Sequence, residues 1–186
     1  MSVLFPMNIH RCGSLLLLLG LSGCGPEIRE YQVPVAQEDY LPSDLLRDAF
    51  DVIPFRWDVP SEWAEAENDQ FSAFAWETAT SGEKARITVS PLSEGAGLEQ
   101  QFVRWRGQIG LPPVDPSEAM KDVQSLVLDG CTGEYVEYKG ESETILGMIV
   151  PFKGKLWIFK LRGANAAAEK SRAPFRAFCE SLKVAS

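Results

Sequence analysis

The clearest periodic pattern in the chain lies between residues 98 and 109. Apolar residues recur there at intervals of four, three and four, the spacing of one helical face: Leu98, Phe102, Trp105 and Ile109. Gly110 and the pair Pro112-Pro113 follow and are typical of a helix end. The pattern therefore predicts a helix over 98–109. Another face of this helix carries three polar side chains: Gln101, Arg104 and Gln108.

Shorter segments have the alternation and the β-branched or aromatic residues that are typical of strands. The predicted strands cover residues 55–60, 71–76, 85–90, 123–128, 133–139, 144–150 and 155–161. Turns over 81–84 and 151–154 join two pairs of these strands, and a short helix is predicted over 116–121.

The strands 144–150 and 155–161 are apolar on both faces. In the first strand Ile145 and Ile149 oppose Leu146, Met148 and Val150, and in the second Leu156 and Ile158 oppose Trp157, Phe159 and Leu161. A strand of this kind lies inside a sheet that is covered on both sides. The pattern predicts a single α/β domain with helices on both faces of a central sheet.

A helix is also predicted from about Ala164 to the end of the chain. Its apolar stripe consists of Phe175, Phe178, Cys179 and Leu182. Pro174 lies inside this segment, and proline has no amide hydrogen to donate to the preceding turn. We therefore expect a kink or a restart of the helix, with Ala173 as the boundary.

The first 24 residues have the composition of an export signal. A basic start ends at Arg11, and an apolar core and a small-residue region follow. Only nine residues separate Leu15 and Gly23, inclusive, whereas a helix needs roughly 20 residues to cross the hydrocarbon layer. The segment is therefore predicted to direct export rather than to span the membrane.

The end of this segment, Leu21-Ser22-Gly23-Cys24, resembles the bacterial lipobox. The resemblance implies cleavage before Cys24 by signal peptidase II and acylation of that cysteine, with palmitate among the acyl chains. Two or more chains give stable anchoring to a membrane. Gly25, in place of an aspartate, favours the periplasmic face of the outer membrane. The alternative is an ordinary cleaved signal in which Cys24 has no role.

The chain thus divides into three parts. Residues 1–23 are the predicted lipoprotein signal peptide, and their removal from 186 residues leaves 163, enough for one domain and a tether. Residues 24–53 form the predicted anchor and tether, since 25–42 contain three prolines and a short helix is expected over 43–50. The globular domain is predicted to cover 54–186.

Charge and histidine content exclude several classes of function. The net charge of −8 becomes −9 when the signal and its single base, Arg11, are removed. An acidic surface repels phosphate groups, so no nucleic-acid partner is expected. The only histidine, His10, lies in the signal. Catalytic Ser-His or Cys-His pairs and histidine zinc sites are therefore excluded from the mature chain, and no catalytic, cofactor or metal site is predicted.

Two cysteines remain in the mature domain after Cys12 is lost and Cys24 is acylated. Cys131 and Cys179 would close a loop of 49 residues, and such a disulfide is worth about 4 kcal/mol in the chain-entropy model. The alternative is a pair of buried thiols, because Cys179 belongs to the apolar stripe of its helix. The sequence leaves both alternatives open.

Two groups of acidic residues allow an enzymatic alternative. They are Glu62, Glu65, Glu67 and Asp69 in one loop, and Glu134, Glu137, Glu141 and Glu143 around one hairpin. Two carboxyl groups facing each other in a cleft can hydrolyse a sugar bond without histidine. Because no spacing singles out a pair, a solvated acidic rim is the favoured interpretation of these residues.

The polar face of the helix 98–109 is the candidate binding surface. The guanidinium of Arg104 can bind a carboxylate through two hydrogen bonds, and the amides of Gln101 and Gln108 can bind a partner's backbone. Trp105 belongs to the apolar stripe and is expected in the core. An ordinary solvated helix face is the alternative.

Three segments carry a resemblance to a known family. Arg-Trp-Arg-Gly-Gln-Ile-Gly-Leu-Pro-Pro over 104–113, the segment 57–63, and the ending with Phe175, Phe178 and 181–183 resemble an uncharacterised family of bacterial envelope lipoproteins. That family is distantly similar in fold to the PsbP, Mog1 and DcrB group. The resemblance implies a mainly antiparallel sheet with helices on both faces. It also implies an accessory role without catalytic residues.

Together these observations predict a membrane-anchored envelope lipoprotein that is not an enzyme. Its domain is expected to bind or stabilise another envelope protein or a small ligand. A carboxylate-dependent hydrolase or lyase acting on envelope polysaccharide is the alternative, and a purely structural spacer is a third.

Overall fold

The computed structural model describes residues 53–185. The predictions for the signal peptide, Cys24, the tether and the helix over 43–50 lie outside the described residues. The strands are β1 (Phe55–Arg56), β2 (Ala64–Glu65), β3 (Phe74–Thr80), β4 (Glu83–Ser93), β5 (Gln124–Leu128), β6 (Cys131–Lys139), β7 (Glu143–Phe152), β8 (Lys155–Ala164) and β9 (Lys183–Val184). The helices are η1 (Glu94–Ala96), α2 (Leu98–Gln108), α3 (Pro116–Ala119), η2 (Met120–Asp122) and α4 (Asn165–Glu180).

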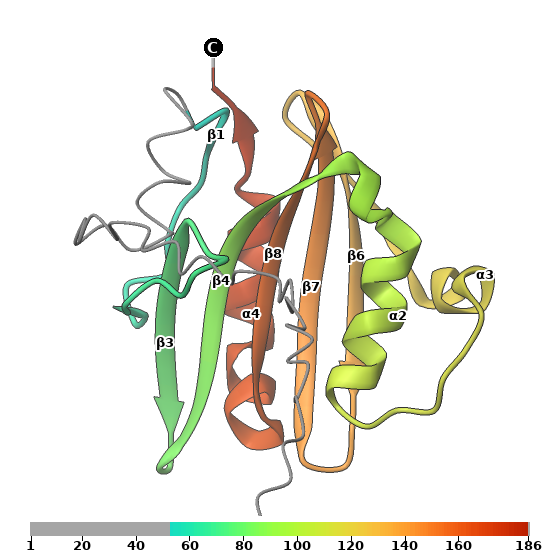
Figure 1. Ribbon diagram of the computed structural model, residues 1–186. Helices are drawn as coiled ribbons and strands as arrows, with labels where there is room; N and C mark the ends of the chain where they lie inside the picture. Colours follow the sequence, from blue (N-terminus) through green and yellow to red (C-terminus); the bar gives the residue numbers. More distant parts are fainter. Residues whose placement is uncertain (1–52, 186) are drawn as a thin grey trace, which may run out of the picture. The chain divides into compact units, whose positions relative to one another are not determined.

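Seven strands form one sheet in the order β2-β3-β4-β8-β7-β6-β5, and every pairing between neighbours is antiparallel. Most neighbours are hairpins of consecutive strands (Figure 1). The exception is β4, which pairs with β8 and so joins the two halves of the sheet. The segment between β4 and β5 contains α2 and α3. The expected antiparallel α+β fold in a single domain is confirmed.

Helices cover both faces of this sheet, as the strands that are apolar on both sides predicted. α4 lies behind the sheet in Figure 1 and α2 in front of it. The core on the α4 face contains Leu146, Met148 and Val150, while Ile145 and Ile149 belong to the core beneath α2. The predicted alternation along residues 144–150 is therefore confirmed.

The packing of α2 on the sheet depends on a glycine. Trp105 is buried beneath α2 with 2% of its surface exposed, and its ring lies directly over Gly147 of β7. A Cβ atom added at residue 147 would collide with three carbon atoms of this ring. The contact brings α2 close to the sheet and fixes the direction of its other side chains.

Several boundaries differ from the prediction. The strand expected over 55–60 is only β1, which pairs with β9 outside the main sheet. The strand expected from Phe71 begins at Phe74, because the side chain of Asp69 accepts hydrogen bonds from the backbone of Phe71 and Ser72 and holds a turn there. The turn at Ser81 and Gly82, both with positive φ, is as predicted.

α4 continues through Pro174 from Asn165 to Glu180, so the expected restart of the helix is not observed. The cost of a missing amide hydrogen is offset by packing, since Ser171, Phe175 and Phe178 are buried on both sides of the proline. No helix in the described range 53–185 has the length and apolar character needed to cross a membrane.

Both cysteines of the domain are free thiols in the structure. Cys179 is fully buried in the core beneath α4, and Cys131 is half-buried at the start of β6. Burial raises the pKa of both thiols, with a further increase at Cys131 from the charge of Asp129. The structure thus contains two free thiols, of which only Cys179 is fully buried.

Candidate functional site

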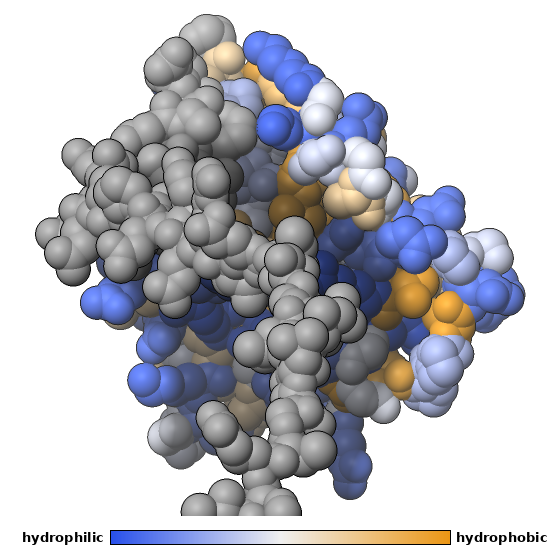
Figure 2. All heavy atoms as spheres, in the orientation of Figure 1, coloured by the Kyte–Doolittle hydropathy of each residue, from blue (hydrophilic) through white to orange (hydrophobic). Residues whose placement is uncertain are grey.

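The candidate site is a groove on the α2 face of the sheet. The apolar side of α2 packs over β6, β7 and the first half of β8. β4 and the second half of β8 are left uncovered by the helix, and a cavity of about 560 Å³ lies there. Figure 2 shows hydrophilic atoms beside α2, and a mixture of hydrophilic and apolar atoms over α2 and α3.

Strand alternation explains the polar floor of this groove. In β4, Ile87 and Val89 face α4, so Arg86, Thr88 and Ser90 point to the other side. In β8, Phe159 and Leu161 face α4, so Lys160 and Arg162 point into the groove. The two strands are paired with Thr88 opposite Lys160.

The helix side of the groove carries all three residues that the sequence predicted: Gln101, Arg104 and Gln108. Arg104 is exposed, whereas Gln101 is buried and donates a hydrogen bond from Nε2 to the carbonyl oxygen of Ala96 at 3.1 Å. The side-chain oxygen of Gln108 is buried and accepts no hydrogen bond. This side chain, which lines the groove, therefore has a buried oxygen without a hydrogen-bond partner.

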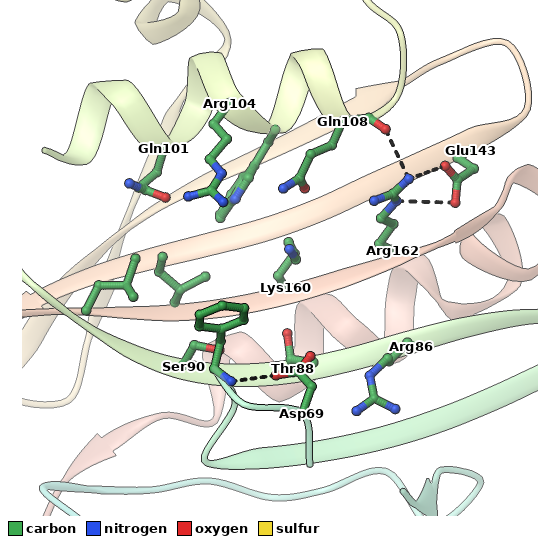
Figure 3. A pocket seen from close by; sticks show the side chains of 14 residues that line it. Asp69, Arg86, Thr88, Ser90, Gln101, Arg104, Gln108, Glu143, Lys160 and Arg162 are labelled. Atoms are coloured by element: carbon green, nitrogen blue, oxygen red, sulfur yellow. Dashed lines mark hydrogen bonds and ion pairs between the residues drawn. The ribbon is translucent and has the colours of Figure 1, made fainter. Parts of the chain in front are cut away.

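Four cationic side chains line the groove, and two of them have acidic partners while the other two do not (Figure 3). Arg162 binds both oxygens of Glu143, at 3.2 and 2.6 Å, and donates to the carbonyl oxygen of Gln108 at 3.0 Å. Arg86 lies 3.5 Å from a carboxylate oxygen of Glu77. The other two cations, Arg104 and Lys160, form no ion pair with any residue of the described part.

The electrostatic environment of Lys160 is unfavourable for its charge. Burial lowers the pKa of its ammonium group, and the nearby positive charges of Arg162 and Arg104 lower it further. Asp69 opposes these effects but does not cancel them. A protein with a net charge of −8 thus concentrates positive charge in one partly desolvated hollow.

One end of the groove is apolar. Leu92 and Ile158 form part of its floor, and the ring of Phe71 stands at its edge with 63% of the residue exposed. The turn behind Phe71 is fixed, because a carboxylate oxygen of Asp69 accepts hydrogen bonds from the backbone N–H of Phe71 and Ser72, both at 2.9 Å. The exposed ring is therefore positioned by a defined turn.

The two predicted acidic groups do not form a cluster of facing carboxylates in the groove. Of their eight members, only Asp69 and Glu143 line it, and both are engaged by other groups. Partial burial favours a raised pKa for Asp69, but hydrogen bonds from Phe71 and Ser72 and the charge of Arg86 leave that pKa below its ordinary value. Elsewhere Glu137 pairs with Arg172, and Glu134 accepts a hydrogen bond from Ser125.

Sequence reasoning identified the helix side of the site and missed the sheet side. Trp105 is in the core, as expected, and the predicted helix places its three polar residues at the groove. Arg86, Lys160 and Phe71 were not recognised as site residues. The polar positions alternating with apolar ones in β4 and β8 were a signal, but their convergence depends on the pairing of two strands that are distant in sequence.

No family model matches the chain, and its sequence matches no curated protein. Similar solved structures include LpqN of Mycobacterium tuberculosis, which is described as involved in cell envelope biogenesis. LpqN is 11% identical over 71% of this chain and 83% of its own, with a TM-score of 0.45. The PsbP protein of the cyanobacterium Synechocystis, CyanoP, is 13% identical over 71% of this chain and 87% of its own, with a TM-score of 0.47.

A third similar structure comes from Bacteroides thetaiotaomicron, at 14% identity over 72% of this chain and 46% of its own, with a TM-score of 0.40. The helix motif of 104–113 and the lipoprotein family have no counterpart in the comparisons. Similarities this low support no conclusion about the function of the chain.

Proposed function

We propose that this chain is a lipid-anchored protein of the bacterial cell envelope whose domain is a non-catalytic binding module. The groove between α2 and strands β4 and β8 binds another envelope protein or a small ligand. The observation that carries this proposal is the pair of unsatisfied cations, Arg104 and Lys160, beside the unpaired side-chain oxygen of Gln108. The partly buried charge of Lys160 costs stability when it is unpaired, and a binding partner can compensate for it.

The state of the acids supports binding rather than acid–base chemistry. A general acid that works near neutral pH needs a raised pKa. The pKa of Asp69 is instead below its ordinary value because of the hydrogen bonds of its turn. Glu143 is held by two hydrogen bonds from Arg162. Asp69 is thus poorly suited to donate a proton, and Glu143 is already bound by Arg162, so the polysaccharide hydrolase or lyase has less support.

Site-specific photo-crosslinking in the intact envelope tests the groove as a binding site. A photoreactive residue is placed at Arg104 or at Phe71, and a control is placed at Lys121, an exposed residue outside the groove that pairs with Glu118. We expect the same adduct from both groove positions and no such adduct from residue 121. Adducts that are absent, or equal at all three positions, would contradict the proposal.

The anchor is tested separately at Cys24. Replacement by serine removes the thiol that a lipobox cysteine uses for acylation, so Cys24→Ser is expected to leave an unprocessed or soluble protein. Membrane fractionation and the intact mass of the mature chain measure the outcome. The anchor is wrong if the variant still partitions with membranes and has the wild-type mature mass.

A further inference from the structure

The groove has two chemically different ends, and this difference restricts what it can bind. Arg104 supplies positive charge from α2, at the side of the groove, and Lys160 supplies it from β8, in the floor. An anion between them would relieve the repulsion that the two cations exert on each other. The guanidinium of Arg104 offers several hydrogen-bond donors in a plane, which suits a carboxylate or a phosphate group.

The other end is suited to an apolar group. The ring of Phe71 is one of only three large apolar side chains that are exposed in the described part of the chain. It lines the same groove as the apolar residues Leu92 and Ile158. Covering such a ring and floor removes apolar surface from water, which favours binding. A purely inorganic anion would leave this end of the groove unused.

From these two ends we propose that the ligand of the groove is a small amphiphilic anion. Its carboxylate or phosphate group lies between Arg104 and Lys160, and its apolar body lies against Phe71 and Leu92. This inference rests on the proposed function of the groove as a binding site.

The size and the surroundings of the groove favour a small molecule over an extended polyanion. Its volume of about 560 Å³ lies within the range of roughly 300–1,000 Å³ that is usual for small-molecule sites. The net charge of the whole chain is −8, so a long anion that left the groove would meet repulsion. Only a compact anion gains the local attraction without that cost.

Titration calorimetry of the full processed protein in phosphatidylcholine nanodiscs tests this inference, with empty nanodiscs as the blank. The four probes are hexanoate, hexyl phosphate, inorganic phosphate and hexanol. We expect hexanoate or hexyl phosphate to bind at least about tenfold more tightly than both hexanol and inorganic phosphate, since each of the latter lacks one half of the interaction. Whichever of hexanoate and hexyl phosphate binds more tightly identifies carboxylate or phosphate as the preferred head group.

Three substitutions test whether the probe binds in the groove. Arg104→Gln and Lys160→Met each remove one charge at similar side-chain length, and each should weaken the anion about tenfold or more. Phe71→Ala should weaken hexanoate or hexyl phosphate severalfold and leave inorganic phosphate unchanged. Lys121→Gln, which removes a cation outside the groove, is the matched control and should change nothing. Far-UV circular dichroism confirms that each variant is folded.

The outcomes separate this inference from the proposed function. The inference is supported if hexanoate or hexyl phosphate binds to the wild type and this binding is lost in the groove variants. If hexanol binds as tightly as hexanoate, if no probe binds, or if Lys121→Gln weakens binding as much as Arg104→Gln, the amphiphilic anion is wrong. The proposed function still stands in that case if the photo-crosslinks from residues 71 and 104 appear, and it fails with the inference if they do not.

Discussion

The two faces of the central sheet are built from the same strands but differ in how they are covered. The α4 face is covered from β3 to β7 by one long helix and carries an aromatic core. The α2 face is apolar only beneath α2 and is open and cationic over β4 and β8. Each of these two strands contributes to both faces, with Ile87 beside Arg86 and Phe159 beside Lys160. The groove thus lies where α2 no longer covers the sheet, and β4 and β8 form its floor with ordinary strand alternation.

The largest expected effect comes from the covered face. The ring of Phe178 in α4 has five aromatic neighbours with centroids 5.2–6.1 Å away: Trp57, Trp63, Trp76, Phe159 and Phe175. Phe178→Ala leaves a cavity among them and should lower the free energy of unfolding by about 3–5 kcal/mol. Urea denaturation measures the change.

The matched control is the same substitution on the open face. Phe71 is 63% exposed, so Phe71→Ala should change the free energy of unfolding by no more than about 0.5 kcal/mol. Equal costs for the two phenylalanines would contradict the distinction between a stabilising face and a binding face.

The next effect concerns the contact that holds α2 against the sheet. In Gly147→Ala the new methyl group collides with the ring of Trp105, so we expect a loss of about 1–3 kcal/mol in the free energy of unfolding. Because α2 carries Arg104 and Gln108, the same variant should also lose affinity at the groove. Urea denaturation and the calorimetric titration measure the two effects.

Gly107, on α2 itself, provides the control for this glycine. A Cβ atom there meets no atom within 4 Å, and alanine is the better helix former by about 0.5–1 kcal/mol. Gly107→Ala should therefore stabilise the protein. A destabilised Gly107→Ala together with an unaffected Gly147→Ala would show that the packing of α2 has been misread.

What the sequence could predict depended on whether the signal was local. The helix over 98–109 and the alternation within 144–150 follow from periodicity inside one segment, and the structure confirms both. The groove requires β4 to pair with β8, which places Thr88 beside Lys160, 72 positions later in the chain. No periodicity within either strand specifies that partner. The β propensity of Phe71 predicted a strand at this position. In the structure, the turn formed by the side chain of Asp69 outweighs that propensity.

A smaller, pH-dependent effect comes from one tyrosine in the core of each face. Burial is the main cause that raises the pKa of Tyr135, on the α4 face, and of Tyr138, on the α2 face, to about 12. The unfolded chain loses these protons near pH 10, so between pH 10 and about 12 it binds fewer protons than the folded protein. Stability should therefore fall as the pH rises through that window.

Tyr138→Phe removes one of these two groups. The hydroxyl of Tyr138 donates a hydrogen bond to the carbonyl oxygen of Ala119 at 3.1 Å, so the variant should lose about 1 kcal/mol at neutral pH. Its stability should then decline less steeply than that of the wild type above pH 10. Denaturation at a series of pH values measures both effects, and a variant whose alkaline decline matched the wild type would contradict the raised pKa of Tyr138.

The last expected effect on stability is a small gain and comes from the groove. Burial and the neighbouring arginines lower the pKa of Lys160, so its charge is a cost to the folded protein at neutral pH. Lys160→Met removes that cost and should stabilise the empty protein by no more than about 1 kcal/mol, while it weakens anion binding.

The cost of this charge depends on pH, and it is fully present below the pKa of Lys160 in the folded protein. It shrinks as the pH rises through that value, since the folded protein then releases its proton before the unfolded chain does. The advantage of the variant should therefore be largest near pH 7 and decrease towards pH 10. If the variant is less stable than the wild type at pH 7, Lys160 already has a compensating partner. The groove would then contribute to the stability of the fold, as the α4 face does, and the contrast between the two faces would be wrong.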